Sequence, residues 1–255
     1  MKPFLLLGTR DEDPAAESEY AAFLSFTGLD ESSLQRIRLE RRPLGRLDLD
    51  DWSGLLLGGG PFNASDPEQR KSAVQRRVER ELGSLLDQVV ARDFPFLGAC
   101  YGIGVLGTHQ GGTVDRTWSE PISRVPVTLT PAGRADPLLD VLPDTFEAFV
   151  GHKEAVDRLP RHAVHLASSP SCPVQAFRVG SNVYATQFHP ELDVAGLCTR
   201  IEVYKHAGYF EPHEADSLKA MARERMVLEP PKILQRFVAR YAAPGLLARG
   251  SASRG

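Results

Sequence analysis

Cys100 has the sequence surroundings of a reactive thiol. It follows the short apolar run Phe96-Leu97-Gly98-Ala99 and precedes Tyr101-Gly102, where small residues and apolar spacing begin a helix. A cysteine on such a sharp strand-to-helix bend is raised above the end of the sheet, and the next backbone N–H is free to bind an oxyanion. The positive end of the helix lowers the pKa of the thiol. We therefore predict a nucleophile with a raised thiolate fraction, although most free cysteines are small buried hydrophobes.

A candidate base for this nucleophile lies at the end of a later strand. Pro190 terminates the apolar run 183–187, so His189 and Glu191 fall in one turn, two positions apart. A cysteine nucleophile needs a base to take its proton and a third group to hold that base in one tautomer. A His-Pro pair alone is more often a solvated turn, but its position downstream of the bend at Cys100 favours catalysis.

Three consecutive glycines, Gly58, Gly59 and Gly60, follow another buried run at residues 52–57. A backbone without side chains can present its N–H groups to a developing anion. A flexible turn is the alternative interpretation, since glycine runs are common in loops.

The elements that position these residues follow from the hydrophobic pattern. Apolar residues three and four apart predict helices, and short apolar runs predict buried strands. Their alternation up to residue 109 predicts a parallel sheet with helices on both faces, and ligands in such sheets bind beyond the carboxyl ends of strands. We expect Asp66-Pro67 to cap a long helix with Val74 on its inner face. The expected strands cover residues 4–8, 37–39, 52–57 and 94–99, and the expected helices cover 14–27, 66–92 and 101–109.

After Ser119 the pattern changes to shorter alternating runs, which predict an added antiparallel strand section. Helical spacing returns after Cys198, and a proline-capped stretch from Pro231 to Tyr241 predicts a further helix. We predict an α/β domain in residues 1–195, a helical extension packed on the same domain in residues 196–245, and a disordered tail in residues 246–255.

The composition excludes several classes of protein. Of 255 residues, 42% are hydrophobic and 25% are charged, and the net charge of -3 does not suggest a nucleic acid or an anionic membrane as partner. Cys100, Cys172 and Cys198 show no paired spacing, which argues against disulfides and metal sites and favours the cytoplasm. The apolar run Phe4–Leu7 is too short to span a membrane.

Three motifs together resemble the class I glutamine amidotransferase family. Along the chain they are Gly58-Gly59-Gly60-Pro61, Gly98-x-Cys100-x-Gly102 and His189-Pro190-Glu191. In this order and spacing they place the resemblance over roughly residues 4 to 195. Gly151-His152-Lys153-Glu154-Ala155-Val156 is similar to a segment of the GMP-synthase-type members.

The resemblance implies a doubly wound, flavodoxin-like fold and a Cys-His-Glu triad. By this resemblance, Cys100 attacks a γ-carboxamide and forms a γ-glutamyl thioester, while ammonia leaves through His189 and Glu191 orients the imidazole. It also implies an oxyanion hole made by the N–H groups of Tyr101 and of Gly59 or Gly60. The chemistry needs no cofactor and no metal.

One position departs from the family pattern. The family continues Gly-x-Cys-x-Gly-x-Gln, and that glutamine helps to hold the amino-acid head of the substrate, but here the position is Gly104. The substrate-binding residues that the resemblance implies are Gly58, Gly104, His152, Lys153 and Glu154. An ordinary strand-to-helix cap is the alternative for residues 152–154, since Lys and Glu are commonly solvated.

Three hypotheses follow for the function. The first is a thiol hydrolase that cleaves a γ-glutamyl amide and releases ammonia for a separate synthetase partner. The second is a γ-glutamyl peptidase or hydrolase acting on a substrate other than glutamine, because a small residue at position 104 would suit a bulkier group. The third is a catalytically idle regulatory or binding module, since a fold does not guarantee chemistry. The sequence leaves the oligomeric state open.

Overall fold

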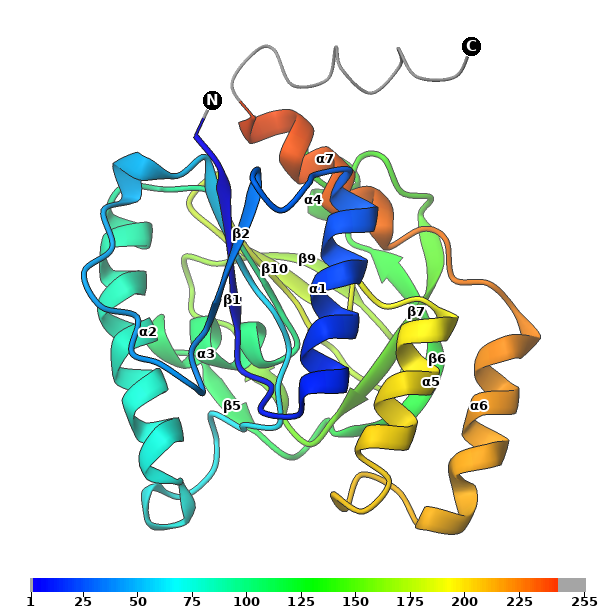
Figure 1. Ribbon diagram of the computed structural model, residues 1–255. Coiled ribbons are helices and arrows are strands. Elements are labelled where there is room, and N and C mark those ends of the chain that lie inside the picture. The colour runs from blue at the N-terminus through cyan, green and yellow to red at the C-terminus, as the bar shows by residue number, and fades with distance from the viewer. Residues whose placement is uncertain (1, 243–255) are drawn as a thin grey trace, which may run out of the picture.

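The computed structural model describes residues 2–242, so the predicted disordered tail at 246–255 lies outside the described residues. The main sheet has nine strands in the order β2-β1-β3-β4-β11-β10-β9-β6-β7. It runs through the centre of the molecule, with helices on both sides (Figure 1). The first five are parallel: β2 (Leu34–Arg38), β1 (Phe4–Gly8), β3 (Gly54–Leu57), β4 (Phe96–Ala99) and β11 (Val183–Thr186).

The other half of the sheet is antiparallel. It contains β10 (Ala176–Val179), β9 (Val164–Ser168), β6 (Glu120–Leu129) and β7 (Thr145–His152). A small separate sheet pairs β5 (Thr113–Asp115) with β8 (Ala155–Arg158). The predicted α/β fold with an added antiparallel section is therefore confirmed.

Helices cover both faces of the parallel half because its strands are apolar on both sides. In β1, Phe4 and Leu6 pack in one core with helices α1 (Asp13–Thr27) and α7 (Pro231–Tyr241). Leu5 and Leu7 pack in a second core with α2 (Ala73–Ala91) and α3 (Tyr101–His109). Successive side chains of a strand point to opposite faces, so a continuous apolar run needs both layers.

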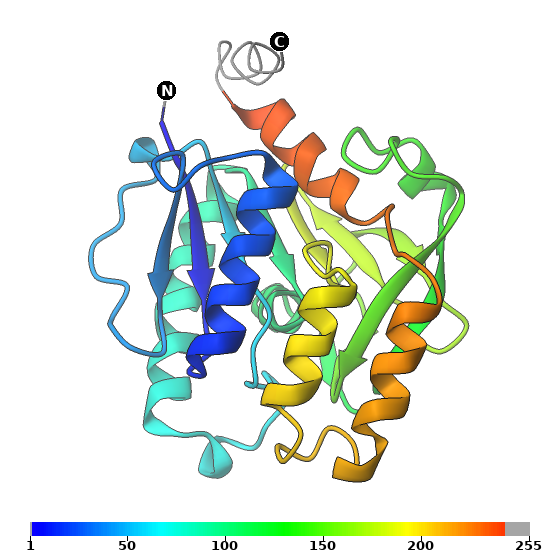
Figure 2. The ribbon, with the colours of Figure 1, turned by 45° about the vertical axis from the view of Figure 1, so that its right-hand side comes forward.

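A third apolar cluster lies under α5 (Val194–Val203) and α6 (Ala215–Glu224), which lie side by side next to the antiparallel strands (Figure 2). Phe149 of β7 joins this cluster. The remaining short elements are α4 (Pro131–Arg134), η1 (Leu49–Asp51), η2 (Glu68–Arg70) and η3 (Pro212–Glu214). The division of the chain at residue 195 stays a prediction. Among the helices of residues 2–242, none has the length and apolar character that crossing a membrane requires.

The predicted start of the long helix is wrong. α2 begins at Ala73, where the side chain of Ser72 accepts a hydrogen bond from Gln75 N at 3.0 Å. Asp66 instead binds Arg116 and Asn63, and Lys71 is extended with ψ 136°, which separates the residues near Asp66 from the helix. Val74 is consequently 38% exposed and does not lie on the inner face.

Candidate active site

Cys100 lies on a strained bend between β4 and α3. Its backbone has φ 51° and ψ -95°, a conformation that costs a non-glycine residue roughly 1–3 kcal/mol and is typical of functional sites. A Cβ atom at Gly98 would lie 3.0 Å from the Cα atom of Gly102, so the bend can close only with small residues. Cys100 N donates to the carbonyl of Thr186 at 2.8 Å, which fixes the bend to β11.

β11 ends at Thr186, and the turn that follows carries His189 and Glu191. Nδ1 of His189 lies 2.8 Å from Oε1 of Glu191, whose side chain is fully buried. The ring and the thiol approach the same point of the glycine loop. A Cβ atom at Gly59 would lie 2.5 Å from Cε1 of His189 and 3.4 Å from Cβ of Cys100. The structure therefore brings together the three residues that the sequence singled out for chemistry.

The glycine loop follows β3 at the same edge of the sheet. The hydroxyl of Thr9 donates to the carbonyl of Gly59 at 3.3 Å, so the N–H of Gly60 in the same trans peptide points to the opposite side. Within residues 2–242, no hydrogen bond uses the N–H of Gly59 or Gly60. The N–H of Tyr101, in the first turn of α3, has no intrahelical acceptor either.

Gly58 and Gly104 do not line the cavities around Cys100. A Cβ atom at Gly58 would lie 2.6 Å from the carboxylate of Glu19, on α1. A Cβ atom at Gly104 would lie 2.6 Å from Oε1 of Glu154. The expected gap at Gly104 is therefore filled by the Glu154 carboxylate, which accepts from Ala64 N at 2.8 Å and Ser65 N at 2.7 Å.

A small recess beside Cys100 is lined by His152, Lys153 and Glu154. His152 ends β7, and Lys153 and Glu154 connect it to β8, so no helix follows these residues as a strand-to-helix cap would require. The side chain of Gln187 also lines the recess, and among the described residues its buried Oε1 has no hydrogen-bond partner. Burial raises the pKa of Glu154, against the hydrogen bonds from Ser65 and Ala64 that lower it.

His152 belongs to a buried polar cluster with Glu120 and Cys172, whose possible ligand atoms lie within 4.8 Å of one another. Its Nδ1 faces the carbonyl of Glu154 and its Nε2 faces Oε2 of Glu120, both at 2.8 Å. Because both ring nitrogens already contact protein oxygens, a metal ion could bind the imidazole only by displacing one of these two contacts. The cluster instead fixes the 152–154 turn.

Sequence reasoning missed a buried network of charged groups behind the imidazole. Arg10 Nε lies 2.9 Å from Oε1 of Glu19, and Arg200 Nη2 lies 3.2 Å from the same oxygen and 2.8 Å from Oε1 of Glu191. All four side chains are buried. Arg10 follows β1 at the edge that carries the glycine loop, a position that could have been noticed. Arg200 lies on α5 and has no local sequence signal.

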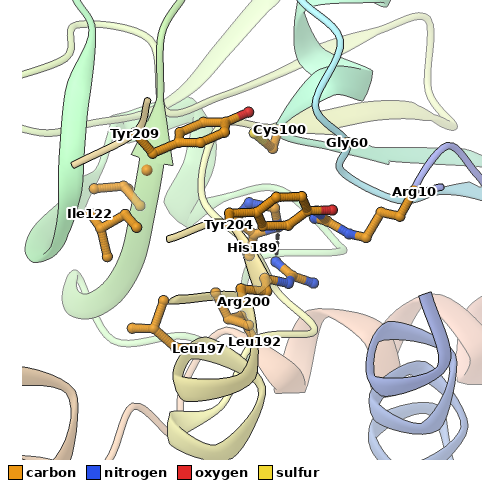
Figure 3. A pocket seen from close by; sticks show the side chains of 12 residues that line it. Arg10, Gly60, Cys100, Ile122, His189, Leu192, Leu197, Arg200, Tyr204 and Tyr209 are labelled. Carbon is orange, nitrogen blue, oxygen red and sulfur yellow. Dashed lines mark hydrogen bonds between the residues drawn. The ribbon is translucent and has the colours of Figure 1, made fainter. Parts of the chain in front are cut away.

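These groups enclose a cavity of about 50 Å³ over the thiol (Figure 3). Cys100, His189 and Gly60 line it together with Arg10, Arg200 and the rings of Tyr204 and Tyr209. Nζ of Lys153 lies 4.1 Å from the centre of the Tyr209 ring, a cation–π contact. A cavity of this volume holds only a few water molecules. The rings of Tyr204 and Tyr209 therefore narrow the access to Cys100, which stays partly exposed in the free protein.

The enclosure changes the expected charge of the nucleophile. Burial raises the pKa of the Cys100 thiol to about 12, although Arg10 and Arg200 act in the opposite direction. The prediction of a raised thiolate fraction is wrong, because burial outweighs the positive end of α3 and both cations. Burial lowers the pKa of His189, and Arg200 lowers it further, while Glu191 raises it. At neutral pH the site holds a neutral thiol beside a neutral imidazole.

Burial alone would raise the pKa of Glu191, but His189 and Arg200 hold it well below its usual range. This carboxylate is therefore ionised throughout the physiological range. Because a buried carboxylate needs compensation, the Arg200 guanidinium 2.8 Å away makes the charge tolerable at this depth.

Comparison with known proteins gives a consistent result. A model of the class-I glutamine amidotransferase family matches residues 33–195. A glutamine-hydrolyzing GMP synthase subunit of Thermoplasma volcanium is 32% identical over 146 residues, which are 57% of this chain and 65% of that protein. The glutamine-hydrolyzing GMP synthase of Acetivibrio thermocellus is 27% identical over 188 residues, 69% of this chain and 34% of that protein. The chain spans less than two thirds of the length of these relatives.

Two solved structures share the fold across most of both chains. A glutamine amidotransferase from Thermotoga maritima has a TM-score of 0.69 at 21% identity and covers 93% of this chain and 99% of its own. A glutamine amido transferase from Methylobacillus flagellatus has a TM-score of 0.71 at 20% identity, with 96% and 98% covered.

Proposed function

We propose that this chain, which belongs to the class I glutamine amidotransferase family, hydrolyses the side-chain amide of glutamine. In this proposal Cys100 is the nucleophile, His189 is the base and Glu191 orients the imidazole. The observation that carries it is the meeting of a strained cysteine and an imidazole–carboxylate pair at one cavity. The bare N–H groups of the glycine loop lie at the same place.

The reaction begins with a proton transfer, because the thiol of the free protein is protonated. His189 takes the proton from Cys100 as the sulfur attacks the γ-carbonyl carbon. The carbonyl oxygen becomes an oxyanion, which the N–H groups of Tyr101 and of Gly59 or Gly60 receive. One such donor is worth about 3–4 kcal/mol in the transition state.

The tetrahedral intermediate then breaks its C–N bond. His189 returns the proton to the leaving nitrogen, ammonia departs, and a γ-glutamyl thioester remains on Cys100. A water molecule attacks the thioester, its proton passes through His189 to the sulfur, and glutamate is released. Each proton that His189 accepts is returned, so the triad ends as it began.

The recess formed by residues 152–154 supports glutamine as the substrate. We propose that His152, Lys153 and Glu154 lie beside the amino-acid head, while Gly58 and Gly104 stand behind the subsite and leave room for the carboxylates of Glu19 and Glu154. The Glu154 carboxylate and the free Oε1 of Gln187 are acceptors suited to an ammonium group. Because Glu154 occupies the space at Gly104, that position offers no room for a bulkier, non-glutamine substrate.

We further propose that the ammonia is consumed by a separate partner enzyme. The similarity to a GMP synthase whose glutamine-hydrolyzing part is a subunit of its own supports this division of labour. The cytoplasmic location predicted from the cysteines is retained as part of the same proposal.

Ammonia release tests this function directly. The purified chain is assayed with glutamine and with γ-glutamyl dipeptides, alone and with cell extract, next to Cys100→Ala and the control Cys198→Ala. We expect release from glutamine that extract stimulates, loss in Cys100→Ala, and no change in Cys198→Ala. Preferred cleavage of the dipeptides would establish the peptidase instead. No turnover of either substrate, with or without extract, would establish the idle module.

A further inference from the structure

One ring nitrogen of His189, Nδ1, contacts two groups that require opposite protonation states of that nitrogen. Nδ1 lies 2.8 Å from Oε1 of Glu191 and 3.0 Å from Nη1 of Arg200. A carboxylate only accepts hydrogen bonds, and a guanidinium only donates them. A protonated Nδ1 suits the carboxylate and an unprotonated Nδ1 suits the guanidinium, so the two contacts select opposite tautomers.

The surroundings of Arg200 favour the second arrangement. Its Nη2 already donates to Glu191 at 2.8 Å and points toward Glu19 at 3.2 Å, so Oε1 of Glu191 is satisfied without a ring proton. Within residues 2–242, Nδ1 is the only acceptor that Nη1 reaches. A protonated Nδ1 would place two donors face to face at 3.0 Å in a buried site. An unprotonated Nδ1 leaves two acceptors 2.8 Å apart, Nδ1 and Oε1 of Glu191, and the guanidinium bridges them because Nη1 donates to the first and Nη2 to the second.

We propose that Arg200 is a positioning residue that holds His189 of the free protein in the tautomer with its proton on Nε2. In that tautomer Nε2 has no lone pair to receive the thiol proton, so the triad is inactive. This inference rests on the proposed function, in which Nε2 is the base.

Glu191 offers the guanidinium a second position. Its Oε2 is buried and has no hydrogen-bond partner among the described residues. A guanidinium fork matches both oxygens of a carboxylate. When Nη1 moves from Nδ1 to Oε2, Nδ1 is free to carry a proton and donate to Oε1. One proton leaves Nε2 and one binds Nδ1, by exchange with water in the cavity, and the net charge does not change.

The position of Arg200 on α5 connects the movement of its Nη1 from His189 to Glu191 with opening of the cavity. The same segment continues from α5 to Tyr204 and Tyr209, whose rings line the cavity over Cys100 (Figure 3). Tyr204 also binds Arg10, since its hydroxyl lies 3.2 Å from Nη1 of that residue. A substrate that displaces these rings therefore acts on the helix and the charged network that hold Arg200.

Nitrogen-15 NMR of the histidine rings in the substrate-free protein tests the tautomer, with the His189 signals assigned by their loss in His189→Gln. At pH 8 we expect a protonated Nε2 and an unprotonated Nδ1 in the wild type, and the reverse in Arg200→Met. The control Arg178→Met, which removes an arginine of β10 from the buried carboxylate of Asp136, should keep the wild-type tautomer. A wild-type ring protonated on Nδ1 would overturn the proposal, whether or not Arg200→Met folds.

The pH profile supplies a readout that a purely structural role would not move. The groups facing the ring are Glu191, Arg200, Arg10 and the Cys100 thiol, with Glu19 behind the arginines. Loss of the Arg200 charge raises the pKa of His189, so Arg200→Met should shift the acid limb of kcat/KM to higher pH, while Arg200→Lys should stay near the wild type. An unshifted limb in Arg200→Met would contradict the proposal. The NMR measurement needs no substrate, so absence of glutaminase activity would overturn the proposed function alone.

Discussion

At the scale of single residues, the neutral state of His189 determines the pH at which the site works. A base must be unprotonated, and burial lowers the pKa of this imidazole below the ordinary value near 6.5. Activity should therefore persist to lower pH than an exposed histidine would allow. We expect the acid limb of kcat/KM for glutamine to lie below pH 6.5. An acid limb of kcat/KM at or above pH 6.5 would show that burial does not set the pKa of His189.

At position 59 the neighbouring side chains leave room only for glycine. The added methyl group of Gly59→Ala would lie 2.5 Å from Cε1 of His189, so the imidazole must move away from the thiol. A displacement of about 1 Å can cost roughly 100-fold in rate, and we expect a loss of kcat of that order. The control Gly83→Ala, on the open side of α2, should leave kcat unchanged and stabilise the helix by about 0.5–1 kcal/mol. Equal kcat in both variants would contradict the assigned geometry.

The residues that could be predicted from sequence are those with local signals. Glycines and Pro190 mark where strands end in the sequence. Because the carboxyl ends of parallel strands meet at one edge of a sheet, these markers were enough to identify Cys100, His189 and Glu191. Arg200 could not be found this way, because its partner Glu19 lies 181 positions away and a buried arginine resembles a surface one in sequence. The high pKa of the thiol was missed for the same reason, since it depends on burial by distant segments.

At the scale of elements, the segment after α5 controls access to the thiol. Tyr209 lines the cavity over Cys100, and the Lys153 ammonium lies on its ring. Tyr209→Ala should widen the cavity and accelerate alkylation of Cys100 by iodoacetamide at least several-fold, because the partly exposed thiol becomes more accessible and less desolvated. Tyr209→Phe keeps the ring and should react at the wild-type rate. Equal rates in Tyr209→Ala and the wild type would show that another segment limits access.

The expected elements were largely correct where periodicity is strong, as in β1 and α7. The start of α2 was misplaced because Asp66 and Ser72 are both good capping residues, and only the contacts with Arg116 and Gln75 distinguish them. Sequence could not reveal that α5 and the connection after it supply Arg200, Tyr204 and Tyr209 to the site. That contribution depends on how α5 packs against the sheet and α1.

At the scale of the whole molecule, α7 closes one core of the sheet. Phe237 is fully buried, and its ring centre lies 6.0 Å from that of Phe4 in the first strand. Phe237→Ala should lower the free energy of unfolding by about 3–5 kcal/mol. We expect fluorescence and circular dichroism to report one shared transition in this variant. Separate transitions for the C-terminal helices and the sheet would indicate that the extension folds independently.

The proposed function requires Cys100 to form a covalent bond to a glutamyl group in this site. Mass spectrometry of the chain after incubation with an electrophilic diazoketone analogue of glutamine tests this bond directly. We predict a single adduct on the Cys100 peptide, prevented by excess glutamine and absent from Cys100→Ala, with Cys172 and Cys198 unmodified. No adduct on Cys100, or equal labelling of the other two cysteines, would contradict it.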